Sequence, residues 1–148
     1  MARPRFRGDR LRAAREAAGL TRKDLTLALG LSSPLRISQW EREFERPQPR
    51  YVPALAAALN VEPLHLLDVD PQDPPLAAIR IAAGKNITEM RADGMSFMTY
   101  QRIEDARPGV DISESVIAVI GDLLTIDRAS VDAAVRRTVK DRDRHQIK

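Results

Sequence analysis

Apolar residues recur along the chain at intervals of three and four, which is the periodicity of amphipathic helices. Four apolar positions share one helical face late in the first half of the chain: Val52, Leu55, Ala56 and Leu59. A second face lies before Gly19 and consists of Leu11, Ala14, Arg15 and Ala18. No stretch alternates apolar and polar residues as a half-buried strand does. The pattern therefore predicts an all-α protein.

Turn and capping residues divide this first part of the chain into five predicted helices. Thr21 and Asp24 have the spacing of a capping box, in which a hydroxyl and an acid satisfy free N–H groups at a helix start. Gly30 suits the end of the helix that they open, and Pro34 suits the first position of the next one. The predicted helices are 11–18, 22–29, one from Pro34 to ERPQPR, 52–59, and a short one opened by Glu62-Pro63.

The same sequence pattern occurs twice. With an offset of 65, LRAAREAAGLTRKDL (11–25) matches LAAIRIAAGKNITEM (76–90), and six of the 15 pairs are identical. The offset is 63 at Trp40-Glu41 against Ile103-Glu104, and it returns to 65 at Leu59-Asn60-Val61 against Leu124-Thr125-Ile126. Such a repeat predicts two copies of one structural unit with altered turns.

The repeat and its flanks predict five segments. Between the copies, DVDPQDPP has three prolines and no apolar cluster, so an extended linker of about 25 Å is expected at about 3.1 Å per residue. After the second copy, Val131, Val135 and Val139 predict a helix docked on that copy or on another subunit. The predicted segments are a basic arm (1–8), a first domain (9–67), a linker (68–75), a second domain (76–131) and a charged helix or tail (132–148).

Charge is unevenly distributed, although the net charge is only +3. Asp9 is the one acid among five arginines in the first 12 residues, and such a cluster favours an anionic partner, with nucleic acid the first candidate. The arm, with Arg3, Arg5 and Arg7, is expected either to enter a DNA groove or to be a solubilising tail. The sequence has no secretory signal and no apolar run that could cross a bilayer, so a cytoplasmic location, at the nucleoid, is expected.

The first copy resembles a known family. The motifs are REAAGLTRKDL, the turn LGLSSP, ISQWE and the final LNV. They are similar to the lambdoid phage repressor and Cro family of helix-turn-helix transcriptional regulators, also called XRE-type, over about residues 9–67. The resemblance implies two small five-helix domains in tandem, the second diverged, with a C-terminal helical extension. It also implies structural ion pairs between Arg15 and Glu41 and between Arg80 and Glu104.

The resemblance further implies which residues face DNA. In the first domain they are Arg22, Lys23, Ser32, Ser33, Arg36, Gln39, Arg42 and Arg46. Arg22, Lys23, Arg42 and Arg46 would contact phosphates, whereas the third helix would lie in the major groove. There Gln39 can pair with adenine and Arg36 with guanine. SSPLR is one residue longer than usual, so the register of this helix is open by one position.

The second copy is the weaker DNA reader. In this copy Ile87 stands in place of Arg22. The residues of the second copy that could contact DNA are Lys85, Ser96, Thr99, Gln101 and Arg102. Phe97 and Met98 would point toward the bases, where an apolar patch more often meets protein. This domain is therefore expected to be either a second reader of DNA or a dimerisation module.

Two functions from different classes follow. The first is a sequence-specific regulator of double-stranded DNA, of the phage or prophage repressor type. The alternative is an adaptor or antitoxin-like protein, in which residues 76–148 bind a second copy or a protein partner. No catalytic motif is present, and an enzyme is not expected. With no cysteine and two histidines, neither a metal site nor a cofactor is expected, and no small-molecule ligand is evident.

Overall fold

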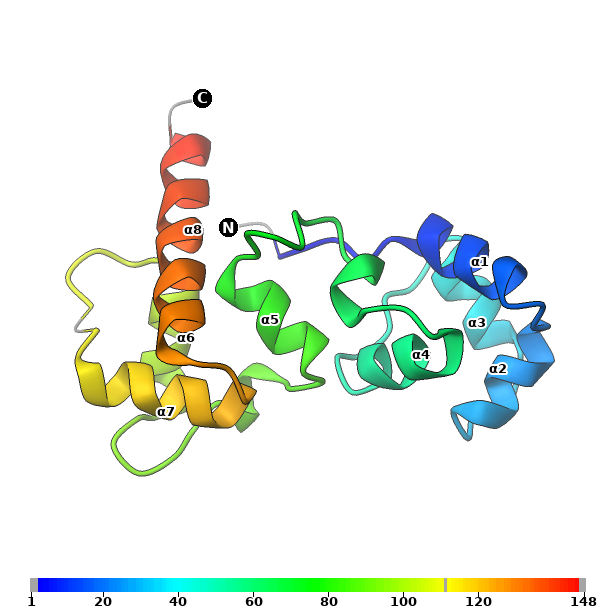
Figure 1. Cartoon of the computed structure of the whole chain (residues 1–148), viewed down its shortest axis with the longest axis horizontal. Helices are drawn as coiled ribbons and strands as arrows, with labels where there is room; N and C mark the ends of the chain where they lie inside the picture. Colours follow the sequence, from blue (N-terminus) through cyan, green and yellow to red (C-terminus); the bar gives the residue numbers. More distant parts are fainter. Residues whose placement is uncertain (1–2, 111, 147–148) are drawn as a thin grey trace.

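The computed structural model describes residues 3–110 and 112–146 and shows that the protein is all-helical, as predicted (Figure 1). No helix within these residues is both long and apolar enough to span a membrane. The α-helices are α1 (Gly8–Ala17), α2 (Arg22–Ala28), α3 (Leu35–Glu41), α4 (Tyr51–Leu59), α5 (Leu76–Ala82), α6 (Phe97–Glu104), α7 (Glu114–Leu124) and α8 (Arg128–Gln146), and the 3₁₀ helices are η1 (Pro63–Leu66) and η2 (Ile87–Glu89).

The helices surround two hydrophobic cores, which define two units. The first unit, residues 3–69, packs α1 to η1 around Trp40, which is completely buried. The second unit, residues 76–146, packs α6, α7 and α8 around Tyr100 and Ile120, which are also completely buried. Each fully buried large apolar side chain contributes about 1.5–3 kcal/mol of transfer free energy. Each unit therefore has its own hydrophobic driving force.

Helix α5 belongs to both cores and lies between the two units (Figure 1). Its Leu76 packs in the second core, whereas Ala78 is buried in the first core and Ile81 packs against it. The preceding segment turns, with the Asp73 N–H donating to the Asp70 carbonyl over 3.1 Å. The expectation of an extended linker is therefore wrong, because helix packing holds the units directly against each other.

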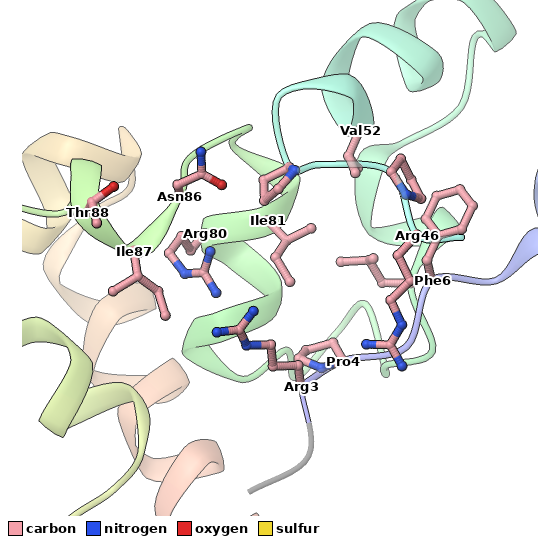
Figure 2. A pocket seen from close by; sticks show the side chains of 13 residues that line it. Arg3, Pro4, Phe6, Arg46, Val52, Arg80, Ile81, Asn86, Ile87 and Thr88 are labelled. Carbon is pink, nitrogen blue, oxygen red and sulfur yellow. The ribbon is translucent and has the colours of Figure 1, made fainter. Parts of the chain in front are cut away.

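A cavity of about 410 Å³ lies in the seam between the units (Figure 2). Its walls come from the N-terminal segment, the chain between α3 and α4, and the two elements α5 and η2. The units also meet where Gly84, which follows α5, approaches Pro53 of α4. A Cβ added at Gly84 would lie 2.9 Å from the Pro53 ring. This close contact and the positive φ of Gly84 both favour glycine here.

Unusual backbone conformations recur at the offsets of the sequence repeat. Three pairs of residues have positive φ at corresponding places: Gly19 and Gly84 (70° and 79°), Glu43 and Ala106 (59° and 53°), and Asn60 and Thr125 (56° and 57°). Each pair follows equivalent helices, namely α1 and α5, α3 and α6, and α4 and α7. Left-handed conformations are uncommon for residues other than glycine, so their recurrence indicates the same chain path in both units.

The second element differs between the units. Helix α2 has the predicted capping box, in which Thr21 Oγ1 accepts from the Asp24 N–H (3.0 Å) and Asp24 Oδ2 from the Thr21 N–H (2.8 Å). At the equivalent place η2 is a single 3₁₀ turn, so the prediction of the same sequence of helices in the second copy is wrong here. Directly after η2 the chain reverses through Gly94, whose φ is 90°. Because of this turn, η2 does not continue into a longer helix.

Helix α8 crosses the predicted boundary at 131/132 without interruption. The prediction of a separate segment that begins at residue 132 is therefore corrected. Its buried face is formed by Val131, Ala134 and Thr138, whereas Val135 and Val139 are half-buried. The Thr138 hydroxyl accepts from the Leu76 N–H (3.0 Å) and donates to the Ala134 carbonyl (2.7 Å). The helix therefore docks on its own unit and fixes the start of α5.

Candidate nucleic-acid interface

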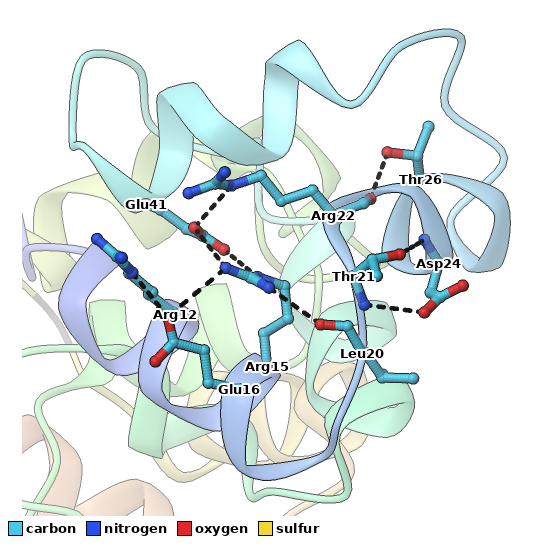
Figure 3. Close-up of polar contacts among 9 residues, drawn as sticks. All are labelled: Arg12, Arg15, Glu16, Leu20, Thr21, Arg22, Asp24, Thr26 and Glu41. Atoms are coloured by element: carbon cyan, nitrogen blue, oxygen red, sulfur yellow. Dashed lines mark hydrogen bonds and ion pairs between the residues drawn. The ribbon is translucent and has the colours of Figure 1, made fainter.

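An ion-pair network connects α1, α2 and α3 in the first unit (Figure 3). Arg15 Nε donates to Glu41 Oε2 over 2.6 Å, and Arg15 Nη1 donates to the Leu20 carbonyl over 3.0 Å. Hydrogen bonding to Glu41, together with its charge, raises the pKa of Arg15 above its ordinary value despite burial. The predicted pair is thus present, and it sets the position of α3 relative to the chain that enters α2.

Arg22 joins this network, which its sequence position did not predict. Its Nε donates to Glu41 Oε1 over 3.1 Å, while 41% of its side chain remains exposed. Lys23, the next residue, is exposed. Both residues lie in the first turn of α2, where free backbone N–H groups also favour an anion.

The turn before α3 is closed by a serine. Ser33 Oγ accepts from the Leu35 N–H over 3.2 Å, so it holds the start of the helix, and α3 begins at Leu35 with Pro34 as its cap. The predicted start is therefore one residue early. Ser32 is exposed, Gln39 is half-buried, and the Leu35 side chain is 61% exposed.

Arg36 occupies a different environment from the predicted base contact. Its guanidinium lies 5.4 Å from the Trp40 ring centroid and 5.3 Å from that of Tyr51. Such cation–π contacts are worth about 0.5–1 kcal/mol at a partly exposed site. In this conformation Arg36 joins α3 to α4 instead of projecting outward from α3.

Arg50 is a basic residue that the motif comparison missed. It precedes α4, its Nη2 donates to the Tyr51 hydroxyl over 2.9 Å, and its guanidinium lies 4.8 Å from the ring centroid. Burial raises the pKa of Tyr51, but hydrogen bonds from Arg50 and Arg36 outweigh it and lower the pKa below its ordinary value. The dipeptide Arg50-Tyr51 at a helix start was the available signal.

Two further arginines follow α3. Arg42 is exposed and its guanidinium lies 5.3 Å from the Phe44 ring centroid. Arg46 is also exposed, and it lines the cavity between the units. Basic side chains therefore stand at the start of α2 and beyond the end of α3.

The N-terminal segment does not form the predicted free arm over residues 3–7. The Arg7 N–H donates to the Leu66 carbonyl and the Asp68 N–H to the Arg5 carbonyl, each over 2.7 Å, and Phe6 is buried in the first core. The segment is therefore paired with the chain after η1. Met1 and Ala2 lie outside the described residues.

Two of the three arginines in this segment, Arg5 and Arg7, lie next to acidic side chains. Arg7 pairs with Asp9 (2.7 Å) and Asp68 (3.2 Å), and Arg5 lies 3.6 Å from Glu43 and 4.0 Å from Asp68. Hydrogen bonding to Arg7 lowers the pKa of Asp9 to about 2. Arg5 and Arg7 therefore face acidic groups of the first unit, and their interpretation as groove contacts stays a prediction. Arg3 lines the cavity between the units.

The second unit contains the equivalent ion pair, with a more deeply buried arginine. Arg80 Nε donates to Glu104 Oε2 (2.8 Å) and Nη2 to Oε1 (2.9 Å), while Nη1 donates to the Lys85 carbonyl (2.9 Å). The exposed fractions of the two side chains are 3% and 6%, against 11% and 1% for Arg15 and Glu41. Both units therefore use one buried arginine to join the first helix, the following turn and the third helix.

The exposed surface of α6 differs from that of α3. Ser96 Oγ caps α6 by accepting from the Thr99 N–H over 3.1 Å, and the two hydroxyls lie 3.1 Å apart. Of the two cations among the predicted contacts, Lys85 is half-buried and Arg102 is exposed. Gln101 lines a cavity beside α8. Ile87, Thr88 and Asp105 occupy the places of Arg22, Lys23 and Arg42.

No group of three or more histidines, aspartates or glutamates within 3–110 and 112–146 could hold a metal ion. The first unit matches a known family. Residues 11–66, which span α1 to η1, match the family model described as helix-turn-helix. No curated protein and no solved structure matches the chain. Residues 11–66 of the first unit are thus similar to a helix-turn-helix domain, which agrees with the predicted resemblance to the XRE-type family.

Proposed function

We propose that the protein is a sequence-specific regulator of transcription that binds double-stranded DNA through its first unit. One observation carries the proposal: within residues 11–66, the exposed cations Lys23 and Arg42 stand at the start of α2 and beyond the end of α3, and Arg22 beside Lys23 is partly exposed. Contacts to phosphates at both ends would hold α3 in the major groove between them.

Base recognition is assigned to the outer surface of α3 and the turn before it. Gln39 offers both a donor and an acceptor, which suits adenine, and Ser32 can bond either kind of base edge. Leu35, which is 61% exposed, would contact a thymine methyl group. Arg36 would read guanine only after leaving the rings of Trp40 and Tyr51.

The second unit is proposed to be a diverged helix-turn-helix domain that supports assembly. The recurring ion pair and backbone conformations support common descent of the two units. The loss of cations at three corresponding positions argues against phosphate contacts by this unit, since those contacts supply most of the affinity of such domains. We propose a repressor of the phage or prophage type in the cytoplasm, at the nucleoid, in which the second unit orients the first.

A second candidate function is binding of a protein partner by the second unit, as in an adaptor or antitoxin-like regulator. Met98 is 55% exposed on α6 beside the half-buried Phe97, at the place where the first unit would read bases. An exposed apolar side chain on this surface favours contact with protein over contact with phosphate.

Selection of binding sites from a random duplex library tests these proposals on the full-length chain. A truncated first unit is unsuitable, because Ala78 of α5 completes its core. Gln39→Ala should change the selected bases, while Met98→Ala should leave the selected sequence unchanged. If no sequence is enriched, the DNA-binding proposal fails and a protein partner should be sought. If Met98→Ala alters the selected bases, α6 reads DNA.

A further inference from the structure

The cavity between the units is lined by both cationic and apolar groups (Figure 2). Its volume of about 410 Å³ is within the range of pockets that hold small organic ligands, about 300–1,000 Å³. The guanidinium groups of Arg3 and Arg46 reach it from different segments of the chain. No carboxylate is among its lining residues. The cavity is therefore suited to an anionic group.

Arg3 and Arg46 differ from Arg80, the third arginine at the cavity, in their hydrogen-bond partners. Arg80 also borders the cavity, but its guanidinium is bound to Glu104 and to the Lys85 carbonyl. Arg3 and Arg46, by contrast, form no hydrogen bond or ion pair with another side chain in the described part of the chain. A guanidinium group can bind carboxylate or phosphate oxygens through two parallel hydrogen bonds.

The opposite walls of the cavity are apolar. Ile81 and Ile87 come from the second unit, and Val52 and Leu67 from the first. Prolines 4, 47 and 49 complete the lining. A ligand bound here would bury aliphatic or aromatic carbon against these side chains while its charged end meets the arginines.

A neighbouring cavity of about 570 Å³ shares Arg3 and Ile87 with the first one but has a different charge. Its lining combines four carboxylates (Asp68, Glu104, Asp105 and Asp141) with three arginines (Arg3, Arg5 and Arg144). The first cavity, whose lining residues include arginines and no carboxylate, is therefore the better suited of the two to an anion.

We propose that the seam between the units is a binding site for a small amphipathic organic anion, with a carboxylate or phosphate on Arg3 and Arg46 and an apolar body against Ile81 and Ile87. Because Arg46 stands beyond α3, an occupied seam withdraws a cation from the DNA-binding surface and weakens DNA binding. This regulatory consequence rests on the proposed function, whereas the binding of the anion does not.

The test uses octanoate as the amphipathic anion, with acetate and 1-octanol as matched controls for its charge and its apolar body. Each is titrated into the full-length protein without DNA and followed by ¹H–¹⁵N NMR. Octanoate should saturate one site, with the largest amide shifts at Ile81, Ile87 and Val52. Absence of saturation, or equal binding of acetate or octanol, overturns the proposal.

Variants then assign the charge recognition. Arg3→Gln and Arg46→Gln should each weaken octanoate binding by about tenfold, because each removes a hydrogen bond to a charged group. Arg107→Gln, an exposed arginine of the second unit, is the matched control and should change nothing. Unchanged affinity in both seam variants, with the native NMR spectrum retained, contradicts the assignment.

A separate measurement distinguishes this inference from the proposed function. Octanoate should weaken binding of the selected DNA by wild type, and DNA should weaken octanoate binding by the same factor. Ile87→Gln, which removes part of the apolar lining, should bind DNA like the wild type but respond to octanoate only at higher concentration. If octanoate saturates the seam while no DNA is selected, the function fails and the site stands. If DNA binds and octanoate does not, the site fails alone.

Discussion

The two units share a buried skeleton and differ on the surface that a helix-turn-helix domain presents to DNA. In both, an arginine of the first helix binds a glutamate at the end of the third and a carbonyl of the turn between them. Where the first unit has Arg22, Lys23 and Arg42, the second has Ile87, Thr88 and Asp105.

This contrast separates the requirements of the fold from those of function. A buried charge must keep its partner, because loss of one partner leaves the other desolvated and unpaired. An exposed cation carries no such cost, so it is retained where it binds an anion. The comparison therefore supports the proposal that the first unit binds DNA and that the second unit serves assembly.

The largest expected effect concerns the buried ion pairs. Glu104→Ala leaves Arg80 buried without its partner and should lower the free energy of unfolding by about 3–5 kcal/mol. Glu41→Ala should cost somewhat less, because Arg15 is nearer to solvent. Urea unfolding followed by circular dichroism measures both.

A matched double variant sharpens that comparison. Arg80→Met combined with Glu104→Met removes both charges and should recover most of the lost stability, because no unpaired charge remains. If Glu104→Ala costs less than about 1 kcal/mol, the pair is not a shared structural requirement of the two units.

The next effect concerns the two glycines that end α1 and α5. Gly19→Ala meets no neighbouring atom and should cost about 1 kcal/mol for its positive φ. Gly84→Ala adds a collision with Pro53 across the seam and should cost about 2–3 kcal/mol. Thermal unfolding of both variants measures the difference. Equal losses would mean that the seam does not hold the units together.

A smaller effect is expected for base discrimination. Gln39→Ala should lower the preference for the selected base over its alternatives by about 1–3 kcal/mol. Arg102→Ala, which occupies the corresponding place on α6, should leave the preference unchanged. Competition binding with single-base variants of the selected site measures both. A loss of preference with Arg102→Ala would make the second unit a reader.

The smallest effect is a pH dependence in the first unit. Arg7 lowers the pKa of Asp9 from 3.8 to about 2 in the folded protein, so the pair stabilises the fold above pH 4. That contribution is lost as the pH falls from about 4 to 2. Asp9→Asn should flatten the stability profile in this range, modestly because the pair is solvent-exposed. Urea unfolding at pH 2.5 and 5 is the measurement, and an unchanged profile would contradict it.

Much of the fold follows from local sequence signals. The Thr21–Asp24 capping box, the stripe of α4 and the glycines after α1 and α2 each act within a few residues of the chain. The path of the N-terminal segment could not be predicted in this way. Its docking depends on Phe6 entering the core and on pairing with residues 66–68, which are distant in sequence.

The sequence predicts which residues form the candidate site better than it predicts where their side chains point. The positions of Lys23, Ser32 and Arg42 follow from the motif, because helix periodicity fixes which residues are exposed. The placement of Arg36 over Trp40 and Tyr51 depends on a tertiary contact between α3 and α4. The seam cavity likewise depends on α5 packing in both cores, which the composition of the linker concealed.

The central claim, that the first unit carries the phosphate contacts, is tested most directly by the salt dependence of binding to the selected DNA. Lys23→Ala with Arg42→Ala should lower the slope of log K against log salt by about two. Lys85→Ala with Arg102→Ala should leave the slope of the wild type unchanged. Equal losses of slope in the two double variants would show that both units contact phosphates and would contradict the account.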